Sequence, residues 1–114
     1  MEFDEFSIVL LTTAPDAPEL DEDASRTVFD GHLSYLATAH DDGHLIGAGP
    51  TSDESLRGVS VVTLDHDRAR TWAEADPAVR AGVFSVQIVP WRVPRGAVAH
   101  TAARFPRSVA EASS

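Results

Sequence analysis

Hydrophobic runs alternate with polar, proline-rich and glycine-rich stretches along this chain of 114 residues. Short runs of β-branched and aliphatic residues predict buried strands, whereas apolar residues spaced three and four positions apart predict amphipathic helices. The first run, "EFSIVLLTT", is too short for a helix and is stopped by the prolines of "APDAPELDED". The pattern predicts four strands, at residues 5–13, 44–50, 57–64 and 83–91.

Two helices are predicted between these strands. The first covers residues 25–42, where apolar residues from Val28 to Ala39 form one stripe that also contains His32, and it ends before Gly43. The second covers residues 66–75, with Asp65 as its N-cap. Pro77 then suits the first position of a short extra turn, which Gly82 closes.

The order of these elements is βαββαβ. Two right-handed crossovers place both helices on one face of a four-stranded antiparallel sheet, so the sequence predicts an α+β fold of the ferredoxin-like arrangement. The strands are apolar on both sides, which leaves one apolar sheet face without helices. An apolar face of that size marks an interface. We therefore expect a homodimer packed sheet to sheet.

The domain organisation follows from where this pattern ends. Residues 1–93 read as one domain, and no repeat or second domain is found. Residues 94–114 are rich in small residues and have a weak pattern. We expect them to form a C-terminal extension that is partly mobile.

Composition narrows the classes of partner. The net charge is −9, from nine arginines, no lysine and eighteen acidic residues, which disfavours binding to the phosphates of nucleic acid. No apolar run approaches the roughly 20 residues that span a bilayer, so no membrane association is expected. The acidic N-terminus "MEFDEF" does not resemble a signal peptide, and cysteine is absent. We expect a cytoplasmic protein.

The candidate catalytic residues are His32 and Asp76. His32 interrupts an apolar helical stripe, and Asp76 precedes Pro77 as the expected cap of the short turn. One interpretation is structural: a core histidine bonded to a backbone carbonyl, and an aspartate that only caps. The other is chemical: Asp76 fixes the tautomer of His32, which then acts as a general acid or base near neutral pH. The sequence leaves both open.

The strand "HLIGAGP" supplies the candidate substrate-binding residues Gly47, Gly49 and Pro50. By simple alternation the two glycines share a strand face with Leu45, and Ala48 lies opposite. Glycine is costly in a strand unless a ligand or a ring approaches closely. These residues are therefore expected to shape the wall of a pocket for a small organic molecule beside the histidine.

No metal site or cofactor is predicted. His40 and His44 have a spacing that resembles a pair of metal ligands, but Gly43 ends the helix between them and two ligands do not complete a coordination shell. The chain contains no nucleophile elbow, P-loop or dinucleotide fingerprint.

Two segments carry a resemblance to a known family. "DGHLSYLATAHDDGHLIGAGP" (residues 30–50) and "ARTWAEADPAVRAGVFSVQIVPW" (residues 69–91) are similar, in order and spacing, to the YciI-like (YCII-related) family. That family shows an H-L-x-x-L helix, a G-x-L-x-x-x-G-P strand and an A-D-P…A-G-V segment. The resemblance covers roughly residues 5–93.

The resemblance implies a dimeric α/β barrel of ferredoxin-like protomers with one cleft per protomer. It also implies a His-Asp active-site pair, which falls here on His32 and Asp76. One characterised relative is a dehydrochlorinase. Many members carry an aromatic residue after A-D-P, where this chain has Ala78, and a missing ring would open the pocket.

Two hypotheses for function result. The first is a cofactor-free lyase or isomerase in which His32 moves a proton and Asp76 orients the His32 ring. The second is a non-catalytic module of the same fold that binds a small ligand or a protein and keeps the pair only for structure.

Overall fold

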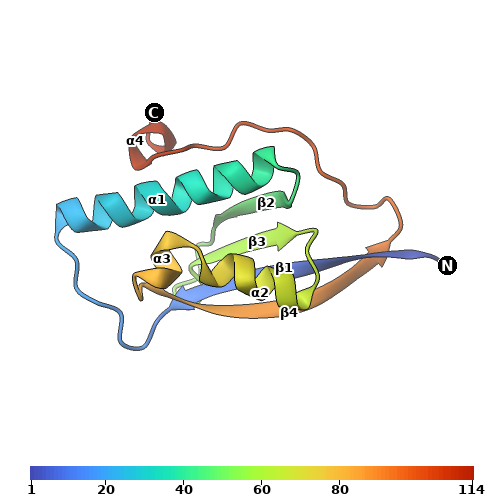
Figure 1. Cartoon of the computed structure of the whole chain (residues 1–114), viewed down its shortest axis with the longest axis horizontal. Coiled ribbons are helices and arrows are strands. Elements are labelled where there is room, and N and C mark those ends of the chain that lie inside the picture. Colours follow the sequence, from blue (N-terminus) through green and yellow to red (C-terminus); the bar gives the residue numbers. More distant parts are fainter.

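A computed structural model describes all residues, 1–114, and shows a four-stranded antiparallel sheet with helices (Figure 1). The strands lie in the spatial order β2-β3-β1-β4, which is the ferredoxin-like order expected from the βαββαβ sequence of elements. Their bounds are β1 (Phe3–Thr13), β2 (Leu45–Pro50), β3 (Gly58–Val62) and β4 (Phe84–Pro94).

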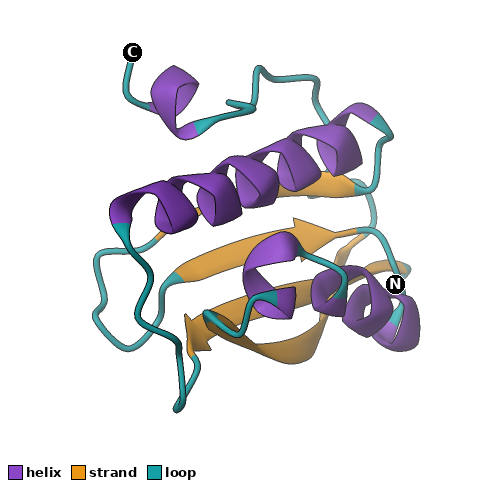
Figure 2. Cartoon of the chain, turned by 60° about the vertical axis from the view of Figure 1, so that its left-hand side comes forward, coloured by secondary structure: helices purple, strands orange, loops and turns teal.

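The helices α1 (Glu22–Asp41), α2 (His66–Glu74) and α3 (Pro77–Arg80) lie on one face of this sheet (Figure 2). A further short helix, α4 (Val109–Ala112), lies near the C-terminus. No helix has the length and apolar character needed to cross a membrane.

Helix ends follow the capping residues in the sequence. The carboxylate of Asp21 accepts a hydrogen bond from the Ala24 amide, so α1 begins at Glu22 rather than at Ser25. Gly43 follows the helix at φ +87°, a left-handed conformation that glycine adopts without steric cost. Asp65 caps α2 as predicted.

The core lies between the sheet and the helices. Ser7, Val9 and Leu11 alternate along β1 and point toward the helices, and the Ser7 hydroxyl donates to the Leu64 carbonyl so that this buried group stays paired. The buried apolar side chains come from all four strands and all three helices of this face: Val9, Leu11, Leu36, Ala39, Leu45, Val62, Ala69, Ala73, Ala78, Phe84 and Ile88.

The opposite sheet face carries no helix (Figure 2). The residues that alternate with the buried ones project from it, and several are apolar and only half-buried in the single chain. Strand register places them beside one another: Ile8, Leu10, Val59, Val61 and Val89.

Strands β1 and β4 are longer than predicted. Beyond the part of β1 that pairs with β3, Phe3 to Phe6 pair with β4 alone and form a two-stranded ribbon. Opposite charges face one another across it, because Arg95 lies 2.6 Å from Glu2 and Arg92 lies 3.7 Å from Glu5. These ion pairs join the two strands of the ribbon, and Arg95 takes part in them although it lies beyond the predicted end of the last strand.

A bulge in β2 corrects the predicted alternation. Leu45 pairs with Val62 but Gly47 pairs with Val61, so Ile46 is an extra residue and the parity of the strand changes there. Leu45 therefore does not share a face with Gly47 and Gly49. The two glycines instead project from the sheet face that carries no helix.

The C-terminal residues return along α1 after β4 (Figure 1). The ring of Phe105 stacks on that of His40 at 4.2 Å, and the Val109 amide donates to the Asp30 carboxylate. The division of the chain at residue 93 and the mobility of the extension stay predictions. The structure shows where this extension docks.

Candidate functional site

The side chains of His32 and Asp76 meet between α1 and α3. Nδ1 of His32 lies 2.7 Å from Oδ2 of Asp76, although the two residues are 44 positions apart in the sequence. Both side chains are largely shielded, with 12% and 5% of their surfaces exposed. The pair considered in the sequence is thus a direct contact.

Asp76 is held in place by its own backbone. It is the N-cap of α3, with extended backbone, and its Oδ1 accepts a hydrogen bond from the Ala78 amide at 2.8 Å. Pro77 occupies the first turn, where no amide donor is needed. With one carboxylate oxygen used for capping, the other is fixed toward His32.

Gly31 allows the close approach of α1 to α3. A β-carbon at this position would lie 3.2 Å from two side-chain carbons of Pro77, which is tighter than ordinary van der Waals contact. Sequence reasoning did not select Gly31. The signal was present, since a glycine inside a helix costs about 1 kcal/mol relative to alanine.

Two phenylalanine rings hold the imidazole of His32 in place. Phe29 and Phe84 both contact it edge to face, at centroid distances of 6.2 and 5.8 Å. Nε2 has no hydrogen-bond partner in the chain. Every buried side-chain nitrogen and oxygen in the structure does have a partner, so Nε2 is not a buried atom. Nε2 therefore lies at the solvent-accessible edge of the ring.

Tyr35 lies one turn after His32 on α1 and contacts Trp72 of α2. Their rings stack at 5.6 Å, and the Tyr35 hydroxyl donates to the Trp72 carbonyl at 2.7 Å. Burial raises the pKa of Tyr35, and the negative charge of Asp76 raises it further. Tyr35 thus stays a neutral donor at physiological pH.

The geometry determines the chemistry that the pair can perform. A carboxylate at Nδ1 holds the imidazole as the Nδ1–H tautomer, which leaves the lone pair of Nε2 free to accept a proton. The same carboxylate stabilises the imidazolium once the proton has been taken. The arrangement is that of a general base with its orienting group.

Two of the three predicted wall residues lie on the other side of the sheet. Gly47 and Gly49 pair with Val61 and Val59 on the face without helices, and a β-carbon at either glycine would meet nothing within 4 Å. Pro50 lies at the exposed end of β2. The two glycines therefore point away from the His32 ring within this chain, whereas the role of Pro50 as a wall residue stays a prediction.

The expectation that Ala78 opens the pocket is not met. Its side chain is fully buried and belongs to the core cluster. The small residue therefore does not open the site to solvent.

The structure contains no cluster of side chains suited to bind a metal ion. No group of three or more His, Cys, Asp or Glu side chains is placed to hold an ion. His40 is buried and bonded through both ring nitrogens, whereas His44 is exposed.

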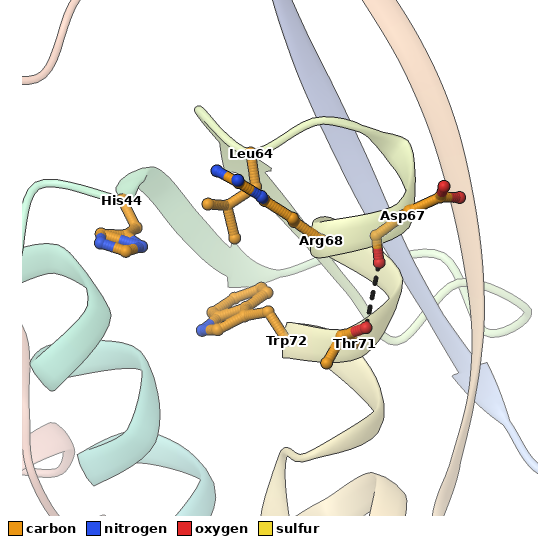
Figure 3. A pocket seen from close by; sticks show the side chains of 6 residues that line it. All are labelled: His44, Leu64, Asp67, Arg68, Thr71 and Trp72. Atoms are coloured by element: carbon orange, nitrogen blue, oxygen red, sulfur yellow. Dashed lines mark hydrogen bonds between the residues drawn. The ribbon is translucent and has the colours of Figure 1, made fainter.

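A shallow hollow of about 390 Å³ lies beside Trp72, lined by residues of α2 together with His44 and Leu64 (Figure 3). The indole and Leu64 form its apolar part, the Arg68 side chain extends across Leu64 in this view, and His44 lies to one side. Asp67 and Thr71 complete the lining. Sequence reasoning did not find this hollow, because its residues come from separate segments with no shared motif.

Comparison with known proteins gives consistent results. The model of the YCII-related domain matches residues 7–92. Protein YciI of Escherichia coli O6:H1 and that of Shigella flexneri are each 35% identical over 72 residues, which cover 54% of this chain and 74% of theirs.

A solved structure shares the fold. It is the 5-chloro-2-hydroxyhydroquinone dehydrochlorinase of Burkholderia phenoliruptrix in complex with 2,5-dihydroxybenzoquinone, with a TM-score of 0.57 and 18% sequence identity. The match covers 75% of this chain and 92% of that one.

Proposed function

Because this chain belongs to the YCII-related domain family, we propose that it is a cofactor-free lyase or isomerase in which His32 transfers a proton and Asp76 orients the ring. Its substrate is a small organic molecule. We also propose a cytoplasmic location, since the chain has no cysteine and so lacks the disulfides typical of proteins from oxidising compartments.

One observation carries this proposal: the carboxylate of Asp76 engages Nδ1 of His32 while Nε2 stays unpaired at the surface of the ring. A histidine kept only for packing is expected to have both nitrogens satisfied, as His40 does in this structure. A ring that is oriented on one side and free on the other is poised for proton transfer.

The proposed step is a deprotonation. Nε2 of His32 takes a proton from an acidic carbon or hydroxyl of the substrate, and the electron pair left behind forms a new double bond. In an elimination a carbon–chlorine bond breaks and chloride leaves with its electrons. In an isomerisation the imidazolium returns the proton to another carbon. The negative charge of Asp76 stabilises the imidazolium in both cases.

The substrate class follows from chemistry of this kind. The dehydrochlorinase with the same fold is bound to a dihydroxylated quinone. Hydroxylated rings and lactones have acidic protons within reach of an imidazole base, so we propose small catechols, chlorinated quinols and lactones as candidates.

A second candidate function is a non-catalytic ligand-binding module. The hollow beside Trp72 favours it, because Trp72 and Leu64 give it an apolar part and Arg68 adds a positive charge to its lining, which suits a small planar anion. In this case His32 and Asp76 stabilise the fold and have no chemical role.

A single screen separates these two functions. Purified protein is incubated with catechols, lactones and chlorinated quinols while chloride release, proton exchange into the substrate and Trp fluorescence are followed. The enzyme hypothesis predicts turnover with at least one class. Fluorescence quenching with no turnover across the panel would favour the binding module, and the Trp91→Phe variant assigns the quenching to Trp72.

We propose further that two chains associate through the sheet face without helices. Five half-buried apolar side chains project from this face in the single chain: Ile8, Leu10, Val59, Val61 and Val89. Burying apolar surface gives about 25 cal/mol for each Å², so pairing such faces favours a dimer. Gly47 and Gly49 leave room at the edge of the same face.

Leu10→Asp is expected to convert the dimer into a folded monomer at micromolar concentration. The carboxylate would have to be desolvated between two sheets, which costs several kcal/mol. Analytical ultracentrifugation gives the mass and circular dichroism checks the fold. Thr71→Asp adds the same charge on the exposed side of α2 and is expected to leave the dimer intact. Sedimentation of the unmodified chain as a stable monomer would contradict the proposed assembly.

A further inference from the structure

His40 is a buried histidine outside the proposed catalytic pair. It lies in the last turn of α1 and joins three segments of the chain. Its Nδ1 lies 2.7 Å from the Leu45 carbonyl of β2, and its Nε2 lies 3.0 Å from the Ala103 amide of the C-terminal extension. Only 2% of its surface is exposed.

These two contacts define the protonation state. The Leu45 carbonyl only accepts, so Nδ1 carries the hydrogen. The Ala103 amide only donates, so Nε2 must offer a lone pair. The ring is therefore the neutral Nδ1–H tautomer while the extension is docked. A proton on Nε2 would place two donors against each other and bury an unpaired charge.

The rest of the docked extension depends on groups whose bonding does not change near neutral pH. Phe105 stacks on the His40 ring, and Arg107 pairs with Asp41. The Val109 amide donates to Asp30. Carboxylates and guanidinium groups keep their charges between pH 5 and 8, so these contacts persist when the solution is made mildly acidic.

Other titratable groups lie near His40 on the extension, on α1 and before β2. His100, on the extension, lies with its ring 4.4 Å from His40 and donates from Nε2 to the His40 carbonyl, a bond that a protonated ring also makes. On the α1 side Asp41 is exposed and paired with Arg107, and Asp42 is exposed. On the β2 side the neighbour is His44, which is exposed. Only protonation of His40 removes a docking bond.

We propose that His40 is an acid-sensitive latch that holds residues 97–112 against α1 when neutral and releases them when protonated. In the docked state Nε2 of His40 cannot bind a proton, whereas in the undocked state it can. Mild acidification therefore favours release, because the equilibrium shifts toward the state that can bind the additional proton. This inference concerns the extension and does not rest on the catalytic role of His32.

Release would also change the surroundings of the helix that carries His32. The extension contacts α1 at His40 and again at Asp30, two residues before His32. At about 100° per residue, Asp30 and His32 face different sides of the helix. Acid would thus uncover the outer side of α1 and leave the His32–Asp76 contact in place.

Amide hydrogen exchange of Ala103, followed by NMR on the full chain, tests this latch. After correction for the intrinsic exchange rate, the protection of this amide is expected to fall as the pH is lowered from 8 to 5, by up to about tenfold for each pH unit. The ¹⁵N shifts of the His40 ring are expected to show an imidazolium when the extension is released. Protection that is constant from pH 8 to pH 5 would overturn the proposal.

Two variants identify the responsible ring. His40→Gln keeps a neutral acceptor near the position of Nε2 at every pH, so its Ala103 protection is expected to be independent of pH. His100→Gln is expected to keep the pH response of the unmodified chain. The reverse pattern would assign the response to His100 and overturn the latch. If His40→Gln does not fold, the ring shifts in the unmodified chain decide, and a charged His40 with a protected Ala103 amide would refute the proposal.

Discussion

Replacement of His32 by asparagine is expected to reduce turnover by roughly 10²- to 10⁴-fold, the usual contribution of a positioned general base. The asparagine amide nitrogen lies near the position of Nδ1 and can still donate to Asp76, but the residue has no atom at the position of Nε2. The substrate found in the screen gives the assay. The loss should appear in kcat, with KM little changed, because the ring acts on the proton and does not provide the main binding surface.

The same substitution is expected to cost about 1–2 kcal/mol of unfolding free energy, since the imidazole packs against Phe29 and Phe84. His66→Asn is the matched control, because His66 is exposed at the start of α2 and makes only a 3.4 Å contact with Asp67. It should change neither turnover nor stability by more than about 0.5 kcal/mol. Destabilisation by several kcal/mol in His32→Asn with turnover retained would show that the ring is only a core element.

Much of the fold was predictable because its signals are local. Asp65 caps its own helix and Gly43 ends one with a positive φ, and both effects depend only on neighbouring residues. The order of elements then leaves few possible topologies, and the ferredoxin-like sheet is among them.

The errors came from pairing, which is not local. Alternation placed Gly47 on the face of Leu45, but the bulge at Ile46 changes the parity, and a bulge depends on how β2 pairs with β3. The ribbon at the ends of β1 and β4 was missed for the same reason, since Glu2 and Arg95 are close only when the strands pair.

The candidate site was predictable only in part. Asp76 as a cap follows from the adjacent Pro77, and His32 stands out within its apolar stripe. Their contact could not be obtained from periodicity, because it depends on how closely α1 approaches α3. Gly31 determines that approach, as a β-carbon there would press on Pro77. The C-terminal docking on His40 depends on a segment with almost no pattern of its own.

Asp76→Asn and Asp76→Ala are expected to separate the structural role of this residue from its chemical one. Asparagine keeps an oxygen that can accept from the Ala78 amide, so the cap on α3 survives. Its amide group then points a donor at His32 Nδ1. The ring must change to the Nε2–H tautomer to accept this bond, which removes the lone pair that the proposed base uses.

Asp76→Asn is therefore expected to lower turnover about 10²- to 10⁴-fold with a modest change in melting temperature, and the ¹⁵N shifts of His32 should report the altered tautomer. Asp76→Ala loses the cap, which costs about 1 kcal/mol of unfolding free energy. It also leaves Nδ1 of His32 unpaired, which costs about 1–3 kcal/mol more. Asp65→Asn makes the same chemical change at the exposed cap of α2, where no histidine donates to the carboxylate, and should leave turnover unaltered. If Asp76→Asn matches Asp65→Asn in turnover and in the His32 tautomer, then Asp76 serves the fold alone. The expected divergence between these two caps instead ties the second oxygen of Asp76 to the chemistry of His32.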